Sequence, residues 1–170
     1  MNPTILTSDY TDAGSFYRAL GPLGRMRQQG LIDLMVTDRP DWTVISQADI
    51  VFMFRPVMNW QLKLARECAG WGVPLWVDVD DHLFSLTPDN PAYGHYSNPA
   101  TVATIKECLN IAKIVTTSTE TLAGVMEDYA SDVRIIPNAQ DPRFNGSPAK
   151  DKKRMILWRG SKTHDKDLEA

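Results

Sequence analysis

The sequence lacks the features that would mark a membrane, secreted or metal-binding protein. Its 170 residues include two cysteines, Cys68 and Cys108, which have no metal-ligand spacing between them and suggest a reducing cytosol. No run of eighteen apolar residues occurs, and the N-terminus has no basic region followed by a long apolar stretch, so we expect a cytoplasmic protein without a membrane-spanning segment. The formal net charge of −3 leaves no global electrostatic signature of nucleic-acid binding.

The chain does contain short apolar runs that alternate with helix-like segments from end to end. The runs are too brief for helices and are rich in Ile, Val and Phe, which is typical of a buried parallel sheet. We therefore predict an α/β fold with a Rossmann-like, doubly wound parallel sheet of about six strands and helices on both faces. The expected strands are residues 4–7, 32–36, 50–54, 75–79, 114–117, 133–136 and 155–158, and the expected helices are residues 15–29, 58–70, 99–112 and 119–129, the first of them kinked or split at Gly21-Pro22.

The composition changes near residue 138. Residues 1–138 form the predicted domain, and residues 139–153 are polar and contain two prolines and a basic cluster, which predicts a linker. Residues 154–170 then give an apolar strand, a turn at Arg159-Gly160-Ser161 and a helix start. Such a turn suits a phosphate group, because its backbone N–H groups and the helix dipole favour an anion. Taken by itself, the turn is better explained as an ordinary capped helix after a strand.

Ligands of open α/β sheets bind beyond the carboxyl ends of the strands, so the residues that follow each strand are candidates for a site. The loop after the first strand carries Gly14, where the backbone can approach a ligand closely, and Ser15, a candidate helix cap. Arg18 lies one turn further, and Arg55 directly follows the third strand. Both arginines suit phosphate or carboxylate binding, and ordinary surface ion pairs are the alternative.

The strongest local signal follows the fourth strand, where Asp78, Asp80, Asp81 and His82 fall within five residues. Like charges this close raise at least one carboxyl pKa unless a cation intervenes. A carboxylate there can act as a general base towards a hydroxyl group, and His82 can share that role. The structural alternative is that Asp78 and Asp80 cap loops or pair with Arg55 and Arg18.

Taken in order, these segments resemble the GT-B class of retaining glycosyltransferases, in the broad style of family 4. The segments that carry the resemblance are Gly-Ser-Phe-Tyr-Arg at 14–18, Asp-Ile-Val-Phe-Met-Phe-Arg at 49–55, Val-Asp-Val-Asp-Asp-His-Leu-Phe at 77–84, Ala-Lys-Ile-Val-Thr-Thr-Ser-Thr-Glu-Thr-Leu-Ala at 112–123, Val-Arg-Ile-Ile-Pro-Asn-Ala at 133–139 and Trp-Arg-Gly-Ser-Lys-Thr-His-Asp-Lys-Asp-Leu at 158–168. Ala139 stands where the family usually has glycine.

The resemblance implies the acceptor-side half of a GT-B enzyme, followed by the very start of a domain that binds a nucleotide-sugar donor. The reaction would take place between the two domains, so this fragment is expected to be inactive alone. No metal and no cofactor other than the donor substrate is implied, and neither the sugar nor the acceptor can be assigned. The implied catalytic residues are His82, Asp81 and Asp80, and the implied donor- or acceptor-binding residues are Gly14, Ser15, Arg18, Arg55, Asn138, Arg159, Gly160 and Ser161.

Two rival interpretations remain open. The segment around Asp78 and Asp80 also resembles the first motif of a haloacid-dehalogenase-like phosphatase, with Asp78 as nucleophile, Asp80 as acid/base and Ser118 in the second motif. That motif normally sits on the first strand. The other rival is a non-catalytic, one-domain binding module. If the second domain is absent, the apolar strand 155–158 is expected to pack back on the first domain, pair with another copy or be disordered.

Overall fold

A computed structural model describes residues 4–7, 13–37 and 42–139 of the chain, and within these ranges it shows an α/β fold built on one parallel sheet. The strands follow the order β2-β1-β3-β4-β5-β6, and every neighbouring pair is parallel. This order places the reversal of strand order between β1 and β3. Their bounds are β1 (Thr4–Thr7), β2 (Asp33–Val36), β3 (Ile50–Phe54), β4 (Leu75–Asp78), β5 (Ile114–Thr117) and β6 (Val133–Ile135).

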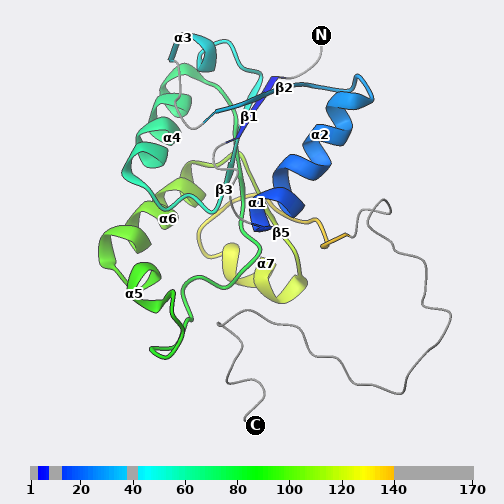
Figure 1. The fold of residues 1–170 in the computed structure, drawn as a ribbon. Helices are drawn as coiled ribbons and strands as arrows, with labels where there is room; N and C mark the ends of the chain where they lie inside the picture. Colours follow the sequence, from blue (N-terminus) through cyan, green and yellow to red (C-terminus); the bar gives the residue numbers. More distant parts are fainter. Residues whose placement is uncertain (1–3, 8–12, 38–41, 140–170) are drawn as a thin grey trace, which may run out of the picture.

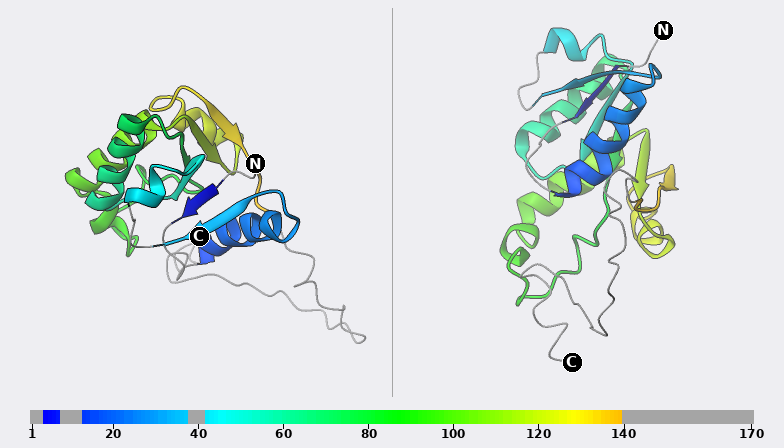
Figure 2. Two further views of the ribbon diagram at one scale, coloured as in Figure 1. Left: turned by 90° about the horizontal axis from the view of Figure 1, so that it is seen from above. Right: turned by 45° about the vertical axis from the view of Figure 1, so that its right-hand side comes forward.

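Helices connect the strands and cover the sheet. They are α1 (Ala13–Ser15), the π-helical turn η1 (Phe16–Leu20), α2 (Gly21–Gln28), α3 (Trp42–Ile45), α4 (Asn59–Trp71), α5 (Tyr93–Tyr96), α6 (Pro99–Ile111) and α7 (Glu120–Met126). Figure 1 shows α2 on one side of the sheet and α4 and α6 on the other, and the views in Figure 2 agree. The two four-residue helices α3 and α5 were not among the predicted elements.

Strand β3 explains why both faces of the sheet are covered. Its side chains alternate, so that Val51 and Met53 enter the core shared with α4 and α6, whereas Phe52 and Phe54 enter the core under η1 and α2. All four are at most 6% exposed. A strand buried on both faces needs a continuous apolar run, and this is the pattern that predicted a doubly wound α/β protein.

The first helical segment differs from its prediction. It begins at Ala13, so Ser15 lies inside it with helical backbone angles and makes no side-chain cap. The expectation that Ser15 caps this helix was therefore wrong, because the helix starts two residues earlier. The winding changes from π to α at Gly21, whose N–H donates to the Phe16 carbonyl, and a Cβ at Gly21 would lie 3.0 Å from that oxygen. Pro22 follows at once, so the Gly21-Pro22 pair changes the winding without breaking the helix.

Cys68 of α4 and Cys108 of α6 lie in the larger core as free thiols. Burial raises the pKa of the Cys68 thiol to about 11 and that of Cys108 to about 12, so both stay protonated and pack as apolar groups. None of the described helices is both long enough and apolar enough to cross a membrane. The predicted second-domain start at 154–170, and the linker beyond residue 139, lie outside the described residues.

Candidate functional site

A fully buried arginine–aspartate pair lies at the carboxyl edge of the sheet. Arg18 of η1 donates from Nε to Asp78 Oδ1 at 2.9 Å and from Nη2 to Asp78 Oδ2 at 2.6 Å. The two side chains are 4% and 2% exposed. Burial opposes the charge of Arg18, but the hydrogen bonds and the negative charge of Asp78 outweigh this and raise the pKa of Arg18 above its ordinary value. Arg18 therefore remains charged inside the protein.

This pair joins four elements of the fold. Thr116 of β5 donates its hydroxyl to Asp78 Oδ2 at 2.5 Å, and the indole N–H of Trp76 donates to Thr116 Oγ1 at 2.8 Å. On the other side, Arg18 Nη1 donates to the Ile136 carbonyl at 2.5 Å and to Asn138 Oδ1 at 3.3 Å. The first helical segment, β4, β5 and the chain that leaves β6 are thus tied together by one network.

Arg55, which follows β3, forms a second and more exposed cluster. Its Nε donates to Asp80 Oδ1 at 2.7 Å, and its Nη2 also binds the Asp81 carboxylate. Arg55 has a φ of 42°, the only positive φ outside glycine among the described residues. A left-handed arginine costs conformational energy, and such strain is concentrated at functional sites. The backbone is held there by the bond from the Arg55 N–H to the Asp78 carbonyl, at 2.9 Å.

The acidic residues of this cluster differ in their exposure. The Asp80 side chain is 13% exposed, whereas that of Asp81 is 60% exposed. Burial raises the pKa of Asp80 above its ordinary value of 3.8, Arg55 opposes this rise, and Asp81 and Asp78 add to it. His82 is exposed, and its ring lies edge-on to Phe84 with 6.4 Å between the centroids. The carboxylate of Asp81 and the imidazole of His82 are therefore the titratable groups open to a reactant.

The structure brings most of the predicted site residues to one edge of the sheet. Arg18 and Asn138 share the buried network, and Asp80 and Asp81 bind Arg55, with His82 next in the chain. The ion pairs are the structural alternative that the sequence left open, with Arg18 on Asp78 and Arg55 on Asp80. Gly14 is half-buried in α1, and Ser15 is 1% exposed. Arg159, Gly160 and Ser161 lie outside the described residues.

Sequence reasoning missed the residues that complete these clusters. Thr116 was included in the expected strand 114–117 without a role of its own, although a polar residue inside an otherwise apolar buried strand needs a hydrogen-bond partner and is a usable signal. The following Thr117 is fully buried, and its hydroxyl has no partner among the described residues. Ser118, a candidate in the phosphatase interpretation, donates to the Asp80 carbonyl at 3.2 Å.

The site contains no metal-binding geometry among residues 4–7, 13–37 and 42–139, since no three His, Cys, Asp or Glu side chains there are arranged to hold an ion. Its donors and acceptors are instead organised as arginine–carboxylate pairs, with one open carboxylate and one open imidazole. Such an arrangement can bind an anionic or hydroxylated ligand and accept a proton from it.

Comparison with known proteins gives one structural likeness. No protein-family model and no curated protein matches the chain. A solved structure of a conserved protein from Enterococcus faecalis V583 aligns with 80% of this chain and 92% of that chain, at 10% sequence identity and a TM-score of 0.37.

Proposed function

We propose that this chain is the acceptor-side domain, the N-terminal half, of a GT-B glycosyltransferase that transfers a sugar from a nucleotide-sugar donor to a hydroxyl acceptor. One observation supports this best: ionic clusters from both sides of the β1/β3 reversal meet at the carboxyl edge of the sheet. Arg18 follows β1 and binds Asp78, the last residue of β4. Arg55 follows β3 and binds Asp80 and Asp81, which come directly after β4. Reversals of strand order are where doubly wound proteins bind their ligands.

In this proposal the exposed groups of the Arg55 cluster act on the acceptor. Asp81, assisted by His82, takes the proton of the acceptor hydroxyl while that oxygen forms a bond to the sugar. The bond between the sugar and the diphosphate breaks, and the nucleoside diphosphate leaves. Asp80 holds Arg55 in its strained position and does not itself meet the substrate. Asn138 accepts a hydrogen bond from Arg18 and would lie where the chain leaves this domain for the donor domain.

The rival phosphatase role finds less support in the geometry of Asp78. Both of its oxygens accept hydrogen bonds from Arg18, one accepts a third from Thr116, and the residue is 1% exposed. A nucleophile needs a free oxygen lone pair directed at an accessible phosphorus atom. Asp78 is therefore better explained as a structural carboxylate, and the acceptor-side interpretation does not require it to react.

A donor screen on the full-length protein tests this function. We expect one class of nucleotide sugar to release its nucleoside diphosphate, and His82→Ala to slow that release by at least about tenfold without changing the unfolding midpoint. His95→Ala is the matched control, because His95 is an exposed histidine of α5. No release from any donor, together with magnesium-dependent hydrolysis of an aryl phosphate that Asp78→Asn abolishes, would replace this function with the phosphatase.

A further inference from the structure

A hollow of about 380 Å³ lies between the segment that follows His82 and the helices α5 and α6. This volume lies within the range of about 300–1,000 Å³ that is usual for small-ligand sites. Leu83, Phe84 and Leu86, which follow His82 in the chain, form one wall. Tyr93 and Tyr96 of α5 form another.

Two residues that line the hollow, Tyr96 and Phe84, lie near residues of the candidate site. Burial lowers the pKa of Arg55, but Asp80 and Asp81 outweigh this and raise it, and Tyr96 is close enough to add a smaller rise. Phe84 lies against His82. A molecule seated in the hollow would therefore extend towards the exposed imidazole and carboxylate at the sheet edge.

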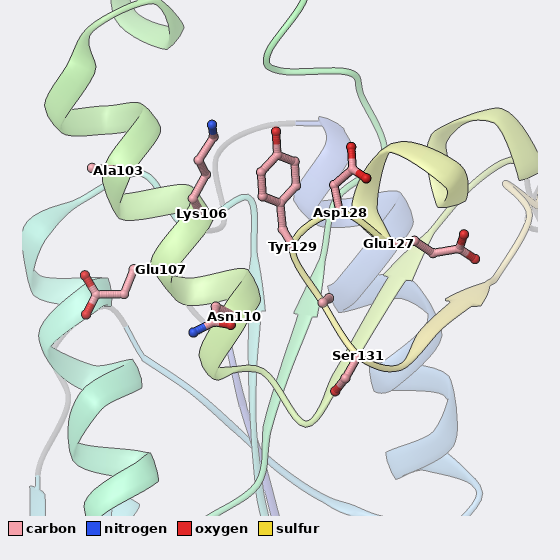
Figure 3. A pocket seen from close by; sticks show the side chains of 9 residues that line it. Ala103, Lys106, Glu107, Asn110, Glu127, Asp128, Tyr129 and Ser131 are labelled. Atoms are coloured by element: carbon pink, nitrogen blue, oxygen red, sulfur yellow. The ribbon is translucent and has the colours of Figure 1, made fainter.

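Six of the eight residues that line the hollow are aliphatic or aromatic, and Lys106 of α6 supplies its cation. The Lys106 ammonium lies 5.6 Å from the centroid of the Phe84 ring and 4.9 Å from that of Tyr129, and the two rings are 5.1 Å apart. Figure 3 shows the Lys106 and Tyr129 side chains standing next to each other. Within the part of the chain that the structure describes, no carboxylate forms an ion pair with Lys106.

A wider hollow of about 650 Å³ lies on the other side of Lys106 and has a different character. Its lining includes the carboxylates of Glu107, Glu127 and Asp128, which Figure 3 shows around its rim. Lys106 lines this hollow too, and the Glu107 carboxylate is paired with Arg66. Glu127 and Asp128 remain as negative charges that oppose an anion in this space. The smaller hollow combines aromatic walls with one cation, and this favours an apolar ligand that carries a negative charge.

We infer that the smaller hollow binds a molecule with a flat apolar body and one anionic group, a carboxylate or a phosphate. The apolar body lies between Phe84 and the tyrosines of α5, and the anionic group meets Lys106. If the proposed function holds, this ligand is the sugar acceptor, and that identification alone rests on the proposed function. Binding itself depends only on the hollow.

A calorimetric titration of the full-length protein with naphthoate tests the inference. Naphthyl phosphate is the probe that carries a phosphate in place of the carboxylate. Naphthalenemethanol has a similar shape without a charge and is the neutral probe. Lys106→Gln removes the charge and keeps most of the side-chain length. Lys63→Gln is the matched control, because Lys63 of α4 also lies over an aromatic ring, 5.2 Å from Trp42, but does not line the hollow.

We expect saturable binding of one naphthoate or naphthyl phosphate, weakened about five- to tenfold by Lys106→Gln and unchanged by Lys63→Gln. The stronger of the two probes identifies the anionic group. Equal affinity for naphthalenemethanol, equal weakening by both lysine variants, or no saturable binding of either anion would overturn the inference. Because no sugar donor is present, failure here leaves the donor screen unaffected, and failure of the screen leaves this binding unaffected.

Discussion

The two arginine–aspartate clusters at the sheet edge use the same chemical groups in different surroundings. Arg18 and Asp78 are buried, bind each other through two hydrogen bonds, and also bind Thr116 of β5 and the chain after β6. Arg55 has a strained backbone and forms ion pairs with both Asp80 and the exposed Asp81. A buried, saturated pair offers nothing to a ligand and fixes the fold. A strained, partly open pair holds a carboxylate where a ligand can reach it. Burial, and not residue type, separates the structural pair from the candidate functional one.

The largest expected effect comes from breaking the buried pair. Arg18→Met leaves the Asp78 carboxylate buried without its cation, so we expect a loss of about 3–5 kcal/mol in the free energy of unfolding, measured by urea denaturation. The double variant Arg18→Met/Asp78→Leu removes both charges and should recover most of that loss. If the double variant is as unstable as the single variant, then the loss of stability comes from the broken hydrogen-bond network and not from the unpaired charge.

A smaller effect is expected at the strained arginine. Arg55→Ala and Arg55→Gly both remove the guanidinium group, but only glycine adopts a φ of 42° without strain. The glycine variant should therefore be more stable than the alanine variant by about 1 kcal/mol in urea denaturation. If alanine is equally stable, then the left-handed backbone at this position carries no strain.

The pH dependence of stability should separate the exposed cluster from an ordinary surface pair. Because burial raises the pKa of Asp80, the folded state binds its proton more tightly than the unfolded chain, and stability falls as the pH rises above 3.8 through the folded pKa. Asp132 behaves oppositely: its hydrogen bond with Arg134 lowers its pKa, so its contribution is present above 3.8 and is lost as the pH falls through the folded pKa.

Urea midpoints between about pH 3 and pH 6 measure this contrast. Relative to the parent protein, Asp80→Asn should gain stability as the pH rises through this range, and Asp132→Asn should lose it. The same sign for both variants would contradict the assigned surroundings of Asp80.

The sequence predicted the fold class because a strand that is buried on both faces of a sheet must consist of a continuous apolar run, and such runs are visible in the sequence. It also placed the main strands closely, as at residues 50–54 and 114–117. It could not decide whether Arg18 and Arg55 bind a ligand or an aspartate, since that depends on distances across three strands. The π turn before Pro22 and the smaller hollow beside Lys106 were missed because each depends on tertiary packing that leaves no local pattern. The Thr116 contact was missed although a polar residue within an apolar strand signals a buried hydrogen bond.

The central claim, that Asp78 supports the fold while Asp81 serves the reaction, is tested most directly by one matched pair of variants. In Asp78→Asn and Asp81→Asn, the free energy of unfolding and the release of nucleoside diphosphate per folded molecule are measured side by side, with the donor found by the screen. We predict a loss of about 3 kcal/mol for Asp78→Asn with little change in turnover per folded molecule. For Asp81→Asn we predict a stability change below about 1 kcal/mol and a loss of about a hundredfold in turnover. Equal losses of stability, or full turnover in Asp81→Asn, would contradict the division of roles between the two clusters.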